Sequence, residues 1–332
     1  MFNDEPSLFP GEDVAVSREQ HRLLYRIGQS YYVDGLTQQQ IAKRFGLSRP
    51  KVSRLLRQAR DAGIVNITLV PPTSGMADLE RELERKYGLE EVVVVLVRDP
   101  QNLSAVAREL GPAAAECLVR SVRGDETVGI TWGTTILAVV DALPFKSWPN
   151  VTIVQIMGGL GPVDELEHST ELAQRAAQRL NARLRLLPAP AVVSTQAAAQ
   201  ALKSDNQIAE TLALAARADI ALVGLGVPSP DAILLRDGNI ITQKDLKLVK
   251  EAGGIGDIAL RYIDAYGAPL DLEINERIVG LTLEQIKAIP RVIGVAGGEA
   301  KYELIRAALR GKILSVLVTD HATAQALLAE TD

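Results

Sequence analysis

Six short apolar runs in the second part of the chain alternate with helical patterns, and this alternation limits the folds that the chain can adopt. The runs read EVVVVLV, TVGITWG, VTIVQIMGG, ADIALVGLG, VIGVAGG and ILSVLVTD. Patterns typical of helices, such as STELAQRAAQRLNA and KYELIRAALRG, lie among them. Strands that alternate with helices imply a mostly parallel sheet covered on both faces. The predicted fold class of this part is therefore α/β.

The first part of the chain differs from the rest in its charge. Between Arg18 and Arg60 there are ten Lys and Arg side chains and two carboxylates, a net charge of +8. The whole chain of 332 residues carries −5, so the remainder carries −13. A cationic end on an acidic protein suits a polyanion such as nucleic acid, although a solvated helical face would have the same composition.

The order of residue types around the turn separates these two interpretations. Thr37 and Gln40 form a capping box that starts one helix, and Gly46 ends it. Ser48 caps a second helix, with Pro50 in its first turn, where a missing N–H costs little. Apolar residues then recur at helical spacing, and the tight turn lets the two helices cross closely. The segment is therefore predicted to be a helix-turn-helix.

Two flanking segments complete the predicted N-terminal domain. Upstream, the sequence SREQHRLLYRIGQSYYVDG places four apolar residues on one face of a third helix: Leu23, Leu24, Ile27 and Tyr31. Downstream, GIVNITLVPP alternates like a strand and resembles a wing. We therefore predict an all-α, winged helix-turn-helix domain over residues 18–70.

Polar residues of the second helix are expected to face outward, because its apolar residues face the small core. An arginine can donate two parallel hydrogen bonds to guanine O6 and N7, a contact worth about 1–3 kcal/mol of discrimination. We expect base readout from Arg49, Ser53, Arg54 and Arg57. We expect phosphate contacts from Thr37, Gln38 and Lys51, which lie at helix N-termini or on their flanks.

Several segments resemble one known family when they are taken together. The stretch YYVDGLTQQQIAKRFGLSRPKVSRLLRQARDAGIV is similar to the N-terminal domain of the SorC family of bacterial sugar-responsive transcriptional regulators. The segments GITWGTT, LLPAPAVV, GLGVP, GGIGDI and VIGVAGGEAKYELIRAALRGKILSVLVTD resemble the effector domain of that family in order and in spacing. The resemblance runs from about Arg18 to the C-terminus. It implies the Rossmann-like arrangement of phosphosugar isomerases, which glucosamine-phosphate deaminases and ribose-phosphate isomerases share.

Composition suggests where the two domains end. PPTSG interrupts the periodicity, so residues 71–77 are predicted to be a linker and residues 78–332 an effector-binding and oligomerisation domain. The acidic start lacks the basic and apolar regions of a signal peptide, so residues 1–17 are predicted to be a disordered tail. The single cysteine, Cys117, is expected to be buried and fits a reducing cytoplasm. No apolar run approaches the roughly 20 residues that cross a bilayer.

Glycine-bearing loops follow several predicted strands, and parallel sheets bind ligands beyond the carboxyl ends of their strands. GITWGTT enters a helix and offers N–H groups and hydroxyls that suit a phosphate, and a lysine at the start of a later helix adds a positive charge. Glycines in such loops also serve simply as turn formers, and this lysine also fits an ordinary surface position. The expected phosphate-binding residues are Gly133, Thr134, Thr135 and Lys301, with Gly224 and Gly226 in a second loop.

The resemblance implies which residues contact the sugar itself. Gln155 and Asp257 correspond to effector contacts of the family, and Glu273 or Asn275 is expected to border the site. Gln155 fits equally well as an inward polar side chain bonded to a loop. Some relatives that bind doubly phosphorylated sugars have an arginine directly before the paired glycines, where this chain has Met157. We therefore expect an effector with one phosphate, either a sugar or a sugar alcohol.

An enzyme is the main alternative, because the implied fold is shared with sugar-phosphate isomerases and deaminases and the second domain could turn over its ligand. Catalysis needs positioned acid and base groups. His168 and His321 form no obvious dyad with a nucleophile, no cluster has metal-ligand spacing, and no nucleotide fingerprint is present. We expect no catalysis, no metal and no cofactor.

Useful affinity for DNA is expected to require more than one copy of the chain. A single helix-turn-helix buries little DNA surface, so we expect a homo-oligomer, a dimer or tetramer, on double-stranded operator DNA of a carbohydrate or polyol operon. The stripe Leu79, Leu83 and Tyr87 would supply apolar surface for assembly, or would pack on its own sheet. The effector acts by favouring one arrangement of the DNA-binding domains, with a typical coupling of about 1–3 kcal/mol.

Overall fold

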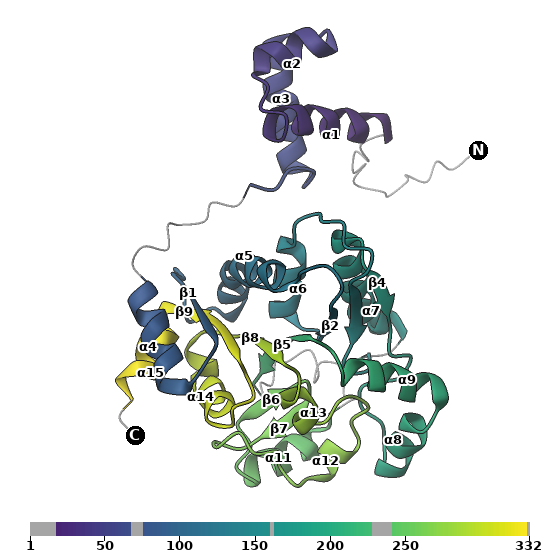
Figure 1. Cartoon of the computed structure of the whole chain (residues 1–332), viewed down its shortest axis with the longest axis vertical. Helices are drawn as coiled ribbons and strands as arrows, with labels where there is room; N and C mark the ends of the chain where they lie inside the picture. Colours follow the sequence, from purple (N-terminus) through teal and green to yellow (C-terminus); the bar gives the residue numbers. More distant parts are fainter. Residues whose placement is uncertain (1–17, 68–75, 160–162, 228–240, 331–332) are drawn as a thin grey trace, which may run out of the picture. The chain divides into compact units, whose positions relative to one another are not determined.

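The computed structural model describes residues 18–67, 76–159, 163–227 and 241–330 (Figure 1). The chain divides into two compact units, Met1–Pro72 and Thr73–Asp332. The tail predicted for residues 1–17 lies outside the described residues. So does the linker predicted for residues 71–77, apart from its last two positions.

Three helices form the smaller unit: α1 (Arg18–Tyr32), α2 (Gln38–Phe45) and α3 (Arg49–Asp61). The side chain of Thr37 accepts the N–H of Gln40, and the Gln40 side chain accepts the N–H of Thr37 at 2.8 Å, so the predicted capping box is present. Gly46 ends α2 with a φ of 65°, in the left-handed region that glycine adopts without strain. The helix-turn-helix prediction is confirmed.

The core of this unit contains most of the apolar residues that the pattern predicts. Leu24, Ile27, Ile41 and Val52 are buried between the three helices. Tyr31, which the pattern predicts on the same face, is exposed at the end of α1, whereas its neighbour Ser30 is buried. The structure describes only part of the predicted wing. Residues 63–67 form a turn and irregular backbone rather than a strand, and residues 68–72 lie outside the described residues.

The larger unit is built on a sheet with the strand order β1-β9-β8-β5-β2-β3-β4, in which all neighbours pair in parallel. All six predicted apolar runs form strands, and a short edge strand, β4, is added. The strands are β1 (Glu91–Val95), β2 (Thr127–Ile130), β3 (Thr152–Gln155), β4 (Arg183–Arg185), β5 (Ile220–Gly226), β8 (Arg291–Val295) and β9 (Val316–Asp320).

Helices cover both faces of this sheet, as the alternating pattern predicts (Figure 1). One core cluster joins the sheet to α5 (Leu103–Ser121), α6 (Thr134–Ala142) and α7 (Val163–Leu180). The cluster on the opposite face joins it to α4 (Ala77–Tyr87), α11 (Gln243–Glu251), α13 (Leu283–Lys287), α14 (Tyr302–Arg310) and α15 (His321–Ala329). The other helices among the described residues of this unit are α8 (Gln196–Lys203), α9 (Asn206–Ala215), α12 (Glu273–Glu276) and the 3₁₀ helix η1 (Glu299–Lys301). Successive strand residues supply both clusters, since Leu222 of β5 lies on one face and Val223 on the other.

The strand order reverses between β2 and β5. From β2 the chain continues to β3 and β4 at one edge, and it then returns to β5, beside β2, and continues through β8 to β9. The connections that leave β2 and β5 therefore diverge, and a crevice forms beyond their carboxyl ends. In open parallel sheets this is the expected position of a ligand.

An antiparallel hairpin, β6 (Gly256–Ile258) and β7 (Arg261–Ile263), extends the sheet locally. The sequence pattern treats GGIGDI as a glycine loop after a strand, but its last three residues form β6. β6 pairs with the end of β5, where Gly226 lies opposite Asp257. The hairpin thus brings Asp257 to the carboxyl end of β5.

The apolar stripe on α4 packs within its own unit. Leu83 is fully buried, and Leu79 and Tyr87 pack against the same core cluster. The Tyr87 hydroxyl donates a hydrogen bond to the carbonyl oxygen of Leu327 on α15. Of the two alternatives, the stripe therefore stabilises its own domain. Cys117 is buried in α5, as predicted.

Replacing Gly111 with alanine should destabilise the larger unit, because α5 and α6 approach each other closely there. A Cβ at position 111 would lie 2.6 Å from the carbonyl oxygen of Ala138. Such overpacking costs about 1–3 kcal/mol of unfolding free energy, which denaturant titration would measure. Glu116→Ala, at an exposed position of the same helix, is the control and should be close to neutral. Equal stability of the two variants would contradict this account of the helix contact.

Candidate functional site

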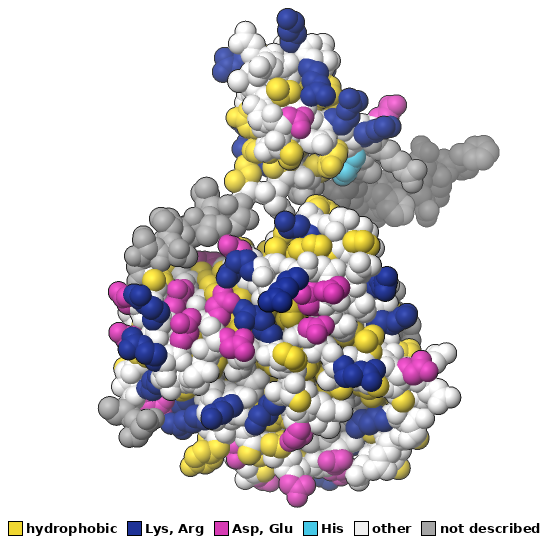
Figure 2. Space-filling view, in the orientation of Figure 1, with side chains coloured by type: hydrophobic (Ala, Val, Ile, Leu, Met, Phe, Trp, Pro, Cys, Tyr) yellow, Lys and Arg dark blue, Asp and Glu magenta, His cyan; other side chains and the backbone are white. Residues whose placement is uncertain are grey.

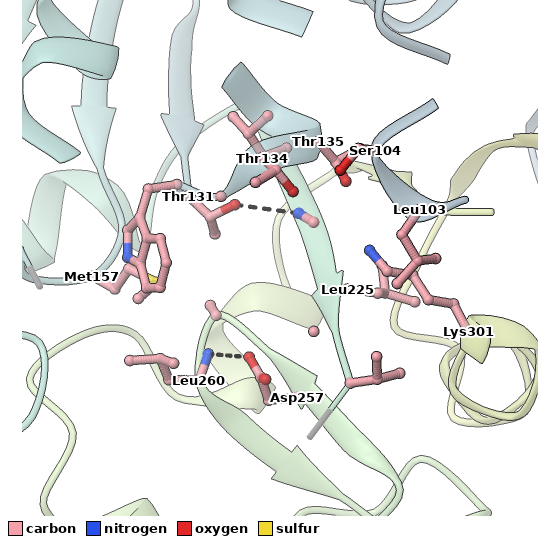
Figure 3. A pocket seen from close by; sticks show the side chains of 17 residues that line it. Leu103, Ser104, Thr131, Thr134, Thr135, Met157, Leu225, Asp257, Leu260 and Lys301 are labelled. Atoms are coloured by element: carbon pink, nitrogen blue, oxygen red, sulfur yellow. Dashed lines mark hydrogen bonds between the residues drawn. The ribbon is translucent and has the colours of Figure 1, made fainter. Parts of the chain in front are cut away.

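A pocket with a volume of about 440 Å³ lies at the carboxyl ends of β2 and β5 (Figure 3). Its walls come from the loop after β2, the first residues of α5 and α6, the end of β5, the β6–β7 hairpin and the end of η1. Seven of the eight predicted effector residues line it: Gly133, Thr134, Thr135, Gly224, Gly226, Asp257 and Lys301.

Gln155 is the predicted residue that does not line the pocket. It is buried at the end of β3, and its Oε1 accepts the backbone N–H of Leu187 at 2.9 Å. The structure therefore matches the alternative of an inward polar side chain bonded to a loop. Glu273 and Asn275 also lie outside the lining, and the Asn275 side chain bonds the backbone of Tyr262 in the hairpin.

One side of the pocket carries hydroxyl groups at the starts of two helices. Figure 3 shows Thr134 and Thr135, the first residues of α6, beside Ser104 at the start of α5. Gly133 precedes α6 with a φ of 131°, and no side chain caps this helix end. Among the described residues, the first N–H groups of α6 therefore have no side-chain cap, and a helix N-terminus in this state favours an anion.

Lys301 extends into the pocket from the end of η1 (Figure 3). Its ammonium forms no ion pair or hydrogen bond with any residue that the structure describes. Burial lowers the pKa of Lys301 to about 8, and the negative charge of Asp257 partly opposes this change. At neutral pH the Lys301 side chain is therefore protonated in most molecules, and its N–H donors are available to an anion.

Asp257 lies across the pocket, with its side chain almost completely buried. Burial raises its pKa to about 7, while the hydrogen bond from Leu260 and the charge of Lys301 act in the opposite direction. The carboxylate packs on Gly226, where a Cβ would lie 2.4 Å from Oδ1. Only glycine at position 226 leaves room for it. Both residues are among the predicted effector contacts, and the pairing of β5 with β6 brings them together.

The turn of the hairpin has an unusual backbone conformation. Ala259 and Leu260 have φ values of 51° and 64°, in the left-handed region. For residues with a Cβ this conformation costs roughly 1–2 kcal/mol each. Both residues line the pocket, so the strain lies in its wall.

The rest of the wall is apolar and comes from residues that the predictions did not select as contacts. Trp132, Leu225 and Leu260 line the pocket together with Met157. The Trp132 indole N–H is buried and has no hydrogen-bond partner in the described structure. Trp132 lies inside the GITWGTT segment, so its place in the motif was the available signal. Ser104 and Leu260 had no such signal, because they come from distant parts of the chain.

Two other glycine loops have packing roles. A Cβ at Gly158 would lie 2.4 Å from the carbonyl oxygen of Ala189, and one at Gly297 would lie 2.4 Å from Oδ2 of Asp320. The N–H of Gly298 donates to Asp320 at 2.7 Å. Gly158, Gly159, Gly297 and Gly298 do not line the pocket, and the turn-former interpretation describes these glycines better.

Figure 2 shows several Lys and Arg side chains on the surface of the helix-turn-helix unit. The predicted DNA contacts are residues of this surface. Thr37, Arg49, Lys51, Ser53, Arg54 and Arg57 are exposed, and Gln38 is half-buried. The four basic residues of this set form no ion pair with any described carboxylate, whereas Arg44 pairs with Asp34 at 3.6 Å. Their donors are free for another partner. The hydroxyl of Thr37 also serves the helix cap, so a phosphate would share it.

Within the described ranges, no group of three or more His, Cys, Asp and Glu side chains is arranged to hold a metal ion. Of the helices in those ranges, none has the length and apolar character to cross a membrane.

Comparisons with known proteins agree with this architecture. Residues 71–329 match the Sugar-bind family, a sugar-binding domain, and residues 16–72 match the MarR family. The deoxyribonucleoside regulator of Bacillus subtilis (strain 168) is 33% identical over 313 residues, 94% of this chain and 99% of the relative. The transcriptional regulator LsrR of Enterobacter sp. (strain 638) is 34% identical over 331 residues, 98% and 97% of the two chains. The crystal structure of the full-length sorbitol operon regulator SorC from Klebsiella pneumoniae superimposes with a TM-score of 0.67 at 30% identity, and the match covers 93% and 99%.

A helix-turn-helix unit joined to a sugar-binding α/β unit defines a transcriptional regulator that responds to an effector. The chain belongs to the SorC family of sugar-binding transcriptional regulators, as its sequence motifs imply.

Replacing Asp257 with asparagine should stabilise the ligand-free protein increasingly as the pH rises. The folded-state pKa of about 7 exceeds the ordinary value of 3.8, so folding favours the protonated form and the wild type loses stability as the pH rises from about 4 through 7. Asparagine does not ionise and escapes this loss. We expect the melting temperature to rise by roughly 5 °C at pH 8 and by little at pH 5, as differential scanning calorimetry would show.

The exposed Asp271→Asn variant is the control and should follow the wild type at each pH. A difference between Asp257→Asn and the wild type that does not depend on pH would contradict the elevated pKa.

Proposed function

We propose that the effector of this regulator is a sugar or sugar alcohol with a single phosphate group, bound in the pocket between β2 and β5. The observation that carries the proposal is the unpaired ammonium of Lys301 in this pocket. Among the described residues that line the pocket it is the only cation, and it makes no ion pair there. An unpaired ammonium that is partly removed from water is costly unless an anion completes the site.

The phosphate would lie against the start of α6. Gly133 lets the backbone approach closely, Thr134 and Thr135 offer hydroxyls, and the uncapped N–H groups of the helix add donors. Lys301 supplies the full positive charge. These are the groups that phosphate sites in α/β proteins combine.

The sugar would lie between Asp257 and the apolar wall. Asp257 accepts a hydrogen bond from a sugar hydroxyl. The Trp132 ring packs on the apolar face of the sugar, which its C–H groups form. Met157 lines this part of the pocket, so no cation is available for a second phosphate among the described residues. This supports an effector with one phosphate.

DNA binding is proposed for the exposed face of α3 and the ends of the two helices. Arg49, Ser53, Arg54 and Arg57 would read bases, and Thr37, Gln38 and Lys51 would hold phosphates. The support for these assignments is their exposure and the absence of ion pairs within the described unit. The operator is proposed to belong to a carbohydrate or polyol operon, because the named relatives regulate sorbitol and deoxyribonucleoside use.

Assembly into a dimer or tetramer is part of the proposal. One helix-turn-helix contacts a short half-site, so affinity and specificity require at least two. The stripe on α4 is buried within its own unit, so another surface of residues 76–330 would join the copies. The phosphosugar then acts by binding one arrangement of subunits more strongly than another.

A second candidate, turnover of the sugar phosphate, is favoured by one observation. Asp257 and Lys301 have pKa values of about 7 and about 8, and groups that titrate near neutral pH in one pocket are typical of catalytic sites. The named relatives are regulators. We therefore propose binding without turnover. A phosphorus NMR time course of protein with a bound sugar phosphate tests it, and loss of the starting signal would favour the enzyme.

Replacing Arg54 with alanine should weaken cognate DNA much more than random DNA, because a base contact is lost only on the cognate sequence. The expected loss on an operator selected from a random pool is about 1–3 kcal/mol, roughly 5-fold to 150-fold in affinity. Fluorescence anisotropy at fixed salt measures both affinities. Lys51→Ala is the matched control, since loss of a phosphate contact weakens both DNAs equally. An equal loss for Arg54→Ala would reassign Arg54 to phosphate.

Replacing Lys301 with methionine, or Thr134 with valine, should abolish stabilisation by the effector while leaving ligand-free DNA binding unchanged. The probes are 2-deoxyribose 5-phosphate, ribose 5-phosphate and sorbitol 6-phosphate, each beside its unphosphorylated form. A ligand at 100 times its Kd stabilises the wild type by about 2.7 kcal/mol, which a thermal shift detects. Lys312→Met, at an exposed position outside the pocket, is the control. Stabilisation that persists in both pocket variants would remove this assignment.

A further inference from the structure

The turn between β6 and β7 has a conformation that its own sequence disfavours. Because Ile258 pairs with Arg261, only Ala259 and Leu260 remain in the loop. Two-residue loops with positive φ at both positions normally contain Asn-Gly, since a Cβ opposes this conformation. Strained backbone of this kind persists only where its surroundings enforce it, and it concentrates at functional sites. Here it forms part of the pocket wall.

One hydrogen bond holds the strained turn from inside. Oδ2 of Asp257 accepts the N–H of Leu260 at 2.9 Å. Asp257 is also the carboxylate that faces the pocket and Lys301. A ligand hydroxyl that bonds this carboxylate competes for the acceptor on which the turn depends.

The hairpin is connected to residues 275–281, which in turn contact another part of the pocket wall. The buried guanidinium of Arg261, the residue after the turn, donates to the carbonyl oxygens of Leu281 at 2.8 Å, Gly280 at 3.0 Å and Asn275. Gly280 forms a β-bridge with Met157, which also lines the pocket. A change in the turn therefore reaches residues 275–281 through Arg261.

We propose that the Ala259–Leu260 turn is an effector-responsive element that is strained in the ligand-free protein and relaxes when a phosphorylated sugar engages Asp257. This inference rests on the effector site proposed above. The strain raises the free energy of the ligand-free conformation, so its release adds to binding and favours the effector-bound arrangement. The alternative is a rigid wall, in which burial of Leu260 offsets the strain in both states.

Glycine at position 259 separates a relaxing turn from a rigid one. Ala259→Gly removes the strain at one residue with the loss of a single methyl group. Lys312→Gly is the matched control, since Lys312 has the same φ of 51° and lies outside the pocket. Both variants should raise the ligand-free melting temperature by about 2–4 °C.

The two variants should differ in their affinity for the probe. For 2-deoxyribose 5-phosphate, or whichever of the three sugar phosphates stabilises the wild type most, calorimetry should show about fivefold weaker binding to Ala259→Gly. Binding to Lys312→Gly should equal that of the wild type. Equal affinity of Ala259→Gly and the wild type would overturn the proposal, because a rigid turn has no strain to release on binding.

Hydrogen–deuterium exchange tests the same element without a sugar. Asp257→Ala removes the side-chain acceptor of the Leu260 N–H. At pH 5, where the wild-type carboxyl is protonated and adds no buried charge, amides in residues 256–263 and 275–281 should exchange faster in the variant. Asp271→Ala should match the wild type. Unchanged exchange in Asp257→Ala would overturn the proposal. If no probe stabilises the wild-type protein, the proposed effector class fails, and this comparison decides independently whether Asp257 holds the turn.

Discussion

The parallel pairing of β2 with β5 is the constraint on which the rest of the larger unit depends. Because the chain leaves these adjacent strands in opposite directions, a crevice forms beyond their ends. The hydroxyl of Thr131 bridges the two strands there, since it donates to the carbonyl oxygen of Leu222 and accepts the N–H of Gly224. The starts of α5 and α6 face the same opening. Elements that are far apart in the sequence therefore form both the anion-binding end and the apolar wall of one pocket.

The polar groups of the pocket cost the protein stability. Asp257 and Lys301 are held where burial opposes the charged form of each, and Ala259 and Leu260 are held in a strained turn. None of these features helps the chain to fold. Proteins retain such unfavourable features where function uses them. A phosphorylated ligand would neutralise the charge of Lys301 and donate a hydrogen bond to Asp257. The stability of the empty pocket and its affinity for an anion are thus opposing properties of the same side chains.

The two units divide the charge of the chain between two tasks. Residues 18–60 carry +8 and the rest −13, so a value averaged over the whole chain describes neither unit. Exposed arginines on α3 have no acidic partner in the described unit, and this leaves them free for a polyanion. The larger unit uses its ion pairs internally, for example between Arg291 and Glu90 at 3.0 Å. Membership of the SorC family agrees with this division between a reader of DNA and a sensor of a sugar.

Features that depend on a few neighbouring residues were determined by the sequence alone. The capping box of Thr37, the left-handed Gly46 and the six apolar runs follow from local hydrogen bonds and periodicity. Most predicted pocket residues lie at the end of a strand or in the loop and helix start that follow one. The tertiary structure decided what depends on distant contacts. Gln155 bonds to Leu187, Gly297 packs on Asp320, and GGIGDI contributes a strand because its end pairs with β5 and β7. In both kinds of loop the missing Cβ of glycine makes room for a close neighbour. The local pattern therefore cannot show whether that neighbour is a ligand or another part of the backbone. The elevated pKa of Asp257 has the same origin, since it reflects burial by segments far along the chain.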